Sequence, residues 1–135
     1  MEIRPKQPTA KGPAERFTGD VWLDVIARGE EPSRVRVSAV HFSPGARTAW
    51  HSHARGQTLY VIEGRGLVQS RGGEITEINS GNMVVTPPDE VHWHGAAPEH
   101  FMAHLSITEG VDEGMVETDW RELVTDEEYR GQQKK

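Results

Sequence analysis

The fold is decided by residues 45–64, which read GARTAWHSHARGQTLYVIEG. Because side chains at positions i and i+2 of an extended chain point to the same face, His51 and His53 place two imidazoles on one face. Gln57 shares their odd parity and joins that face if the strand is unbroken, and Leu59 and Val61 continue the parity into the same interior. Two imidazoles separated by one residue form half of a metal site.

A third imidazole comes from His92, which follows a turn at residues 87–90 with the sequence PPDE. Three histidines at this spacing in turn-bounded strands are typical of a metal site, whereas a lone histidine is more often a surface or core residue. We therefore predict one divalent metal ion per chain, with His51, His53, Gln57 and His92 as ligands. Three nitrogens, one oxygen and no sulfur admit Mn, Fe, Co, Ni, Cu or Zn.

Gln57 decides the charge of this predicted site. A carboxylate ligand would cancel one of the two positive charges of the ion, whereas an amide oxygen cancels none. The site should therefore be a strong Lewis acid that favours an anion or a developing alkoxide. The alternative is that Gln57 marks a lost ligand in a weakened site.

The rest of the chain is predicted to be all-β. Between Phe17 and Ile107, short β-branched or aromatic runs alternate with turns at intervals of roughly ten residues, as in a barrel or sandwich. The runs are 21–26, 35–42, 57–63, 66–70, 74–78, 82–86, 91–94 and 100–107. No connection is long enough for a crossover helix, so we expect antiparallel sheets.

A length of 135 residues argues for one domain over residues 1–135. We divide it into an N-terminal arm (1–15), a barrel (17–110) and a C-terminal segment (111–135). In the last segment, Thr125 and Glu128 form a capping box that begins a short helix through Tyr129.

Composition narrows the classes of partner. The net charge is −6 with scattered Lys and Arg, which disfavours nucleic acid and anionic membranes. No apolar run is long enough to cross a bilayer, and the N-terminus lacks the apolar section of a secretory signal, so a cytoplasmic location is expected. The absence of Cys excludes disulfides, thiolate ligands and a Cys nucleophile. The class of partner that the composition leaves is a small molecule.

Two further histidines are candidates for proton transfer. His94 lies two residues beyond His92, so strand alternation places it on the ligand face, and His104 lies in the last predicted strand. A neutral imidazole close to a Lewis acid suits a general base at neutral pH. The alternative is that either histidine only hydrogen-bonds a ligand or the cavity wall.

Two spaced motifs resemble those of the cupin family. They are Gly45-x5-His51-x-His53-x3-Gln57-x6-Gly64 and Gly81-x5-Pro87-x-Asp89-x2-His92. Gln57 stands where that family usually has Glu, and Asp89 stands where it usually has Gly. The resemblance implies a small antiparallel β-barrel, the double-stranded β-helix or jelly roll.

Within the cupins, the chain is similar over nearly its whole length to the bacterial cupin-type manganese-dependent (R)-hydroxynitrile lyases. The segments that carry this likeness are 11–14, 17–19, 44–51, 56–59, 92–98 and 124–129. In that group Gln is the usual fourth ligand, so the likeness favours Gln57 as a true ligand. It implies an Mn²⁺ cofactor, with Fe, Zn, Ni or Co as alternatives, and a carbon–carbon lyase that cleaves or forms cyanohydrins such as (R)-mandelonitrile.

The same resemblance implies a substrate pocket. His94 and His104 would line it together with Ser38, Val40 and Thr108, three positions that vary in the group and affect activity. From strand parity, Val40, Leu59 and Val61 would receive the aryl group of a cyanohydrin or of the aldehyde that reacts with cyanide.

The sequence leaves two other functions open, and it also predicts that the chain pairs with copies of itself. The chain could be another metal-cupin enzyme, such as a dioxygenase, isomerase or hydrolase, or a cupin that binds a small molecule without catalysis. The arm and the apolar side chains of Val35, Val37 and Ala39 favour a homo-oligomer, either a dimer or a tetramer. The alternative is that these three side chains face a second sheet.

Overall fold

Strands cover about half of residues 1–131, the part of the chain that this computed structural model describes. The last four residues of the predicted C-terminal segment, 132–135, lie outside the described residues. The strands are β1 (Ala10–Lys11), β2 (Phe17–Thr18), β3 (Val21–Ala27), β4 (Val35–Phe42), β5 (Arg47–Thr48), β6 (His51–His53), β7 (Gln57–Ser70), β8 (Thr76–Asn79), β9 (Met83–Thr86), β10 (His92–Ala96), β11 (Met102–Glu109) and β12 (Thr118–Trp120). Helix α1 spans Asp126–Arg130. No helix in the described part is long and apolar enough to cross a membrane.

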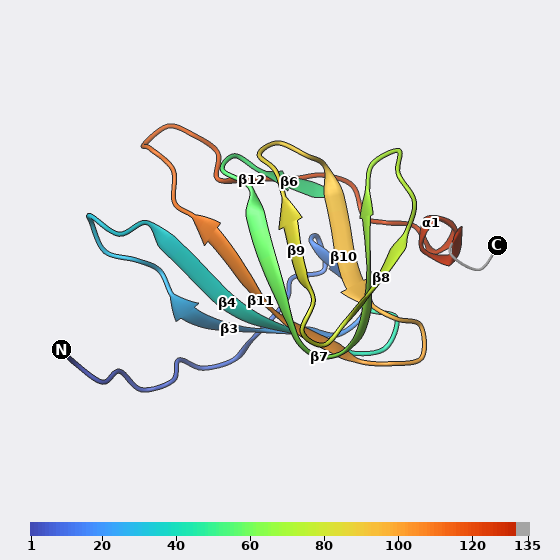
Figure 1. The fold of residues 1–135 in the computed structure, drawn as a ribbon, viewed down its shortest axis with the longest axis horizontal. Coiled ribbons are helices and arrows are strands. Elements are labelled where there is room, and N and C mark those ends of the chain that lie inside the picture. Colours follow the sequence, from blue (N-terminus) through green and yellow to red (C-terminus); the bar gives the residue numbers. More distant parts are fainter. Residues whose placement is uncertain (132–135) are drawn as a thin grey trace.

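The long strand β7 joins two sheets that curl around a common interior (Figure 1). Its first half pairs with β11 and β9, in a sheet that continues through β4 and β3 to β1. Its second half pairs with β10 and β8, and β10 in turn pairs with β5 and β6. Strand β2 pairs with β5, and β12 pairs with β6. All these pairs are antiparallel, as predicted.

The bend of β7 corrects one prediction. Residues 63–66 were expected to form a turn between two strands, but β7 runs through them without a break. Gly64 has a positive φ of 87°, and a Cβ at this position would collide with the backbone carbonyl of Phe101. A Cβ at Gly66 would lie 2.6 Å from the carbonyl oxygen of Gly95. The two glycines thus permit neighbouring strands to approach closely where β7 passes from one sheet to the other.

Strand alternation divides β4 between the interior and the outer surface. Val40 and Phe42 are buried in the core between the sheets, together with Val61 and Met102. The odd-numbered side chains of β4 therefore point outward, and Val35 is exposed. On the same face Val37 is half-buried and Ala39 is buried. Large apolar side chains of β3, β7 and β9, which belong to the same sheet, are also exposed: Trp22, Ile26, Tyr60, Ile62, Met83 and Val85.

Helix α1 begins at the predicted capping box. The backbone N–H of Glu128 donates to Thr125 Oγ1 at 3.0 Å, and the N–H of Thr125 donates to the Glu128 carboxylate at 2.9 Å. A second apolar cluster holds the helix against the outer side of the β10 sheet, where Tyr129 packs near Trp93. The Tyr129 hydroxyl also donates to the carbonyl oxygen of Ala96 at 2.6 Å. The short C-terminal helix is therefore confirmed.

Candidate metal centre

Three histidines from two neighbouring strands meet in the interior. His51 and His53 lie on β6, and His92 begins β10, where it is the register partner of His51. Their candidate ligand nitrogens all lie within 4.8 Å of one another. All three side chains are buried, and the ring centroids of His51 and His92 are 4.4 Å apart. The structure thus brings together the three imidazoles that the spacing singled out.

Each of these imidazoles is oriented through its Nδ1 atom. His51 Nδ1 donates to the carbonyl oxygen of Ala49 at 2.8 Å, and His92 Nδ1 donates to the carbonyl oxygen of Glu90 at 2.9 Å. His53 Nδ1 is hydrogen-bonded to Thr118 Oγ1 at 3.2 Å.

The Nε2 atoms are thereby left to face the centre of the cluster. His53 Nε2 is buried without a hydrogen-bond partner, which is costly unless another group completes the site. Outward hydrogen bonds at Nδ1 and a free Nε2 are the usual arrangement of metal-bound histidines. The residues therefore fit a metal ion.

Gln57 reaches the same centre by a different path from the one predicted. The chain turns at residues 54–56, with a positive φ at Gly56, and β7 starts at Gln57, so the two ligand segments are not one unbroken strand. Gln57 Oε1 lies 3.0 Å from His92 Nε2, and Gln57 Nε2 donates to Ser106 Oγ at 2.9 Å. Ser106 therefore turns the amide so that its oxygen faces the histidines.

Burial keeps these imidazoles neutral. It lowers the pKa of His51 well below its usual range, and burial together with nearby His92 lowers the pKa of His53 to about 4. The pKa of His92 is also lowered by burial, against the opposing effect of its hydrogen bond to Glu90. At neutral pH, the lone pairs that a metal ion needs are therefore available.

A buried pair of histidines lies beside the cluster. His104 Nε2 and His94 Nδ1 are 2.9 Å apart, and the His94 ring is 5.2 Å from that of His51 between centroids. Burial lowers the pKa of His94 well below its usual range and lowers the pKa of His104 to about 3. His94 Nε2 and His104 Nδ1 have no hydrogen-bond partner. The pair is therefore neutral, and each ring retains one unused nitrogen.

A cavity of about 210 Å³ adjoins these histidines. Of the predicted pocket residues, Ser38, Val40 and Thr108 line it, as do His94 and His104. Its other lining residues are Pro13, Arg16, Phe17, Leu23, Thr48, His51, His53, Gln57, Ser106, Thr118 and Trp120. Leu59 and His92 line a neighbouring cavity of about 290 Å³ instead, and Val61 lies wholly within the core.

Comparison with known proteins identifies the architecture. Residues 38–107 match the cupin domain, and the (R)-mandelonitrile lyase of Granulicella tundricola is 49% identical over 132 residues, which cover 96% of this chain and 99% of that protein. The chain belongs to the cupin family. A cupin-like protein from Thermotoga maritima is 40% identical, with a TM-score of 0.84 and 96% of each chain covered. A cupin 2 conserved barrel domain protein from Rhodopseudomonas palustris shares the fold at 16% identity, with a TM-score of 0.67 and coverage of 95% of this chain and 84% of that one.

Strand β12 supplies cavity residues that sequence reasoning missed in this cupin. Thr118 and Trp120 reach the site because β12 pairs with β6, and the Trp120 ring stacks on His51 with centroids 4.6 Å apart. A strand of three residues is too short to show a period of two. The one local sign of a cavity role in this strand was Trp120, an aromatic residue among polar neighbours.

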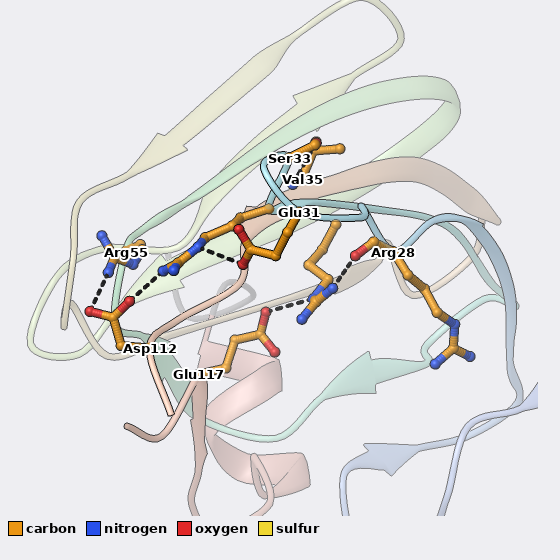
Figure 2. A network of polar contacts seen from close by, with 9 residues as sticks. Arg28, Glu31, Ser33, Val35, Arg55, Asp112 and Glu117 are labelled. Atoms are coloured by element: carbon orange, nitrogen blue, oxygen red, sulfur yellow. Dashed lines mark hydrogen bonds and ion pairs between the residues drawn. The ribbon is translucent and has the colours of Figure 1, made fainter. Parts of the chain in front are cut away.

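Ion pairs tie the segment before β12 to the loops around it (Figure 2). Asp112 bridges Arg34 and Arg55, the latter lying in the turn between His53 and Gln57. Arg36 Nε pairs at 3.1 Å with the carboxylate of Glu117, the residue that precedes Thr118. These contacts hold together the chain segments that carry two of the candidate ligands and their neighbours.

Proposed function

We propose that this cupin is a metal-dependent carbon–carbon lyase that cleaves or forms cyanohydrins such as (R)-mandelonitrile. The observation that carries the proposal is the 49% sequence identity, over nearly the full length of both chains, to the Granulicella protein named (R)-mandelonitrile lyase. The cavity agrees with the reaction. Cleavage of a cyanohydrin needs a base for its hydroxyl and a positive centre for the departing cyanide, and it needs no nucleophile.

The residues divide these tasks between them. His51, His53, His92 and Gln57 would hold a divalent ion, which supplies a Lewis acid when bound. If His94 donates its Nδ1 proton to His104 Nε2, the lone pair of His94 Nε2 remains free to accept the hydroxyl proton. The carbon–carbon bond then breaks, the carbonyl forms, and cyanide leaves with the bonding electrons. Return of the proton from His94 to cyanide releases hydrogen cyanide and restores the neutral pair.

The test is the release of benzaldehyde and cyanide from racemic mandelonitrile, with and without added Mn²⁺. His51→Ala serves as the background control because it removes a candidate ligand. His104→Ala should keep the metal but lose most turnover, since His104 orients the base. Release no higher than that of the His51→Ala control would refute the lyase proposal, and full activity in His104→Ala would remove His104 from the mechanism.

The identity of the ion stays a prediction, and we propose manganese. Neutral imidazole and amide ligands suit several divalent ions, and raw affinity favours the later transition metals. Elemental analysis of purified protein should therefore be paired with activity measured after reloading with Mn, Fe, Co, Ni and Zn. Highest turnover with an ion other than Mn²⁺ would contradict the proposal.

We also propose that the outer face of the sheet formed by β3, β4, β11, β7 and β9 pairs with a second copy of the chain, as a dimer or within a tetramer. Large exposed apolar side chains such as Tyr60, Met83 and Val85 gather there, and exposed apolar surface of this kind marks interfaces. Light scattering should give a mass above one chain, and Val85→Glu should lower it. A monomer at micromolar concentration would refute the proposal. The cytoplasmic location stays a prediction.

A further inference from the structure

The charges around the histidine cavity differ from those of the whole chain. The protein has 21 acidic residues and a net charge of −6. None of the residues that line the cavity is Asp or Glu. Its polar lining is made of hydroxyls, one amide and imidazoles, and its only charged side chain is the guanidinium of Arg16. A cavity without a carboxylate does not repel an anion.

Arg16 is an exposed cation on the lining of this cavity. Its guanidinium carbon lies 5.2 Å from the ring centroid of Trp120, the residue that stacks on His51. Its backbone is fixed by two hydrogen bonds, since its N–H donates to the carbonyl of Pro13 at 3.0 Å and its carbonyl accepts from Ala49 at 2.8 Å.

Arg16 also lacks the partner that most arginines near the site have. Arg34, Arg36, Arg47 and Arg55 each form an ion pair with an Asp or Glu. Among residues 1–131, no carboxylate forms an ion pair with Arg16. Its fork of N–H donors is therefore available to a ligand, and this fork matches the two oxygens of a carboxylate.

We infer that the cavity binds small carboxylates with an apolar body, of the size of mandelate, and that Arg16 holds the carboxylate. Leu23, Val40 and Phe17 offer apolar surface to the rest of the molecule. A volume of about 210 Å³ suits a ligand smaller than the drug-sized molecules that fill pockets of roughly 300–1,000 Å³. The inference rests on the proposed function in placing the reaction in this cavity, and it extends the ligands from neutral cyanohydrins to 2-hydroxy acids.

Calorimetric titration of the Mn²⁺-loaded and the chelator-treated protein with mandelate and with neutral mandelamide tests the inference. Arg16→Gln should weaken mandelate binding about tenfold at low salt and leave mandelamide unchanged, because only mandelate carries the charge. Arg16→Lys, which keeps the positive charge, should lose less mandelate affinity than Arg16→Gln. Arg65→Gln is the matched control, since it removes an exposed charge from a residue that does not line the cavity.

Three results would overturn the inference: no binding of mandelate to the wild-type protein at millimolar concentration, equal mandelate affinity in Arg16→Gln and wild type, or an equal loss for mandelamide. The lyase proposal fails separately. If mandelonitrile is not cleaved but mandelate binding still depends on Arg16, the anion site stands and the lyase activity does not. If mandelonitrile is cleaved but mandelate binding ignores Arg16, only the anion site is lost.

Discussion

Ser106→Ala tests whether Gln57 presents its oxygen, and not its nitrogen, to the three histidines. In the structure, Gln57 Nε2 donates to Ser106 Oγ at 2.9 Å while Oε1 lies 3.0 Å from His92 Nε2. Without the hydroxyl, the amide can rotate by half a turn and place its NH₂ group, which has no lone pair to offer, toward the ion. The substitution should therefore weaken metal binding although Ser106 is not a ligand.

The size of the effect follows from the lost hydrogen bond. A bond of this kind contributes about 1 kcal/mol, and groups that orient ligands change metal affinity by roughly 10–100-fold when removed. We expect a loss of about tenfold, at the lower end of that range, because the amide loses its anchor but the three imidazoles keep theirs. Competition with a fluorescent chelator for Mn²⁺ measures it directly.

Ser38→Ala is the matched control. Ser38 is the register partner of Ser106 across β4 and β11 and lines the same cavity, but it makes no hydrogen bond to Gln57. Ser38→Ala should keep the wild-type affinity for Mn²⁺. Ser106→Thr, which restores a hydroxyl, should recover most of the Mn²⁺ affinity that Ser106→Ala loses. Wild-type affinity in Ser106→Ala, or equal losses in the two alanine variants, would refute the reasoning.

Three further predictions follow from the geometry of the fold and the site. Chelator-treated protein should lose stability as the pH falls from about 6.5 to about 4, because burial lowers the pKa of His53 to about 4 while the unfolded chain takes up that proton near 6.5. The unfolded state then binds more protons, and His53 should account for up to ~3 kcal/mol of the stability lost in urea titrations, so His53→Gln should lose less stability over this pH range than the wild type. Gly64→Ala should cost ~2–4 kcal/mol in thermal unfolding, because the new Cβ meets the Phe101 carbonyl, whereas Gly72→Ala, with a similar φ of 84° but open space around it, should cost ~1 kcal/mol. Gln57→Glu should bind Mn²⁺ more tightly but turn over mandelonitrile more slowly, since the carboxylate cancels part of the charge; a higher kcat in this variant would contradict that account.

Spacing and parity were sufficient where a strand is regular. His51 and His53 are two residues apart on one strand, and the turn at residues 87–90 directs His92 back to them, so their meeting could be predicted without coordinates. The fold class was predictable for the same reason, because alternating runs and short turns leave few arrangements for an antiparallel barrel.

Parity failed where it carries too little information. It places Val61 inside, but the interior contains both a packed core and a cavity, and parity alone does not show that Val61 belongs to the core. Gly64 and Gly66 looked like a turn, since the sequence does not distinguish a glycine that reverses the chain from one that lets two strands approach. Ser106 and Thr118 were missed because each reaches the site through a long-range contact that leaves no local pattern.

The contact between Trp120 and His51 gives the protein an optical reporter of its own site. Of the four tryptophans, Trp50 and Trp93 are buried in the cluster beneath α1, and Trp22 lies exposed on the outer face. Trp120 alone stacks on a candidate ligand, with ring centroids 4.6 Å apart. A paramagnetic ion bound by His51 should therefore quench its emission. Metal uptake and release could then be followed by fluorescence in unlabelled protein, with Trp120→Phe as the reference that keeps the other three tryptophans and lacks the emission of Trp120.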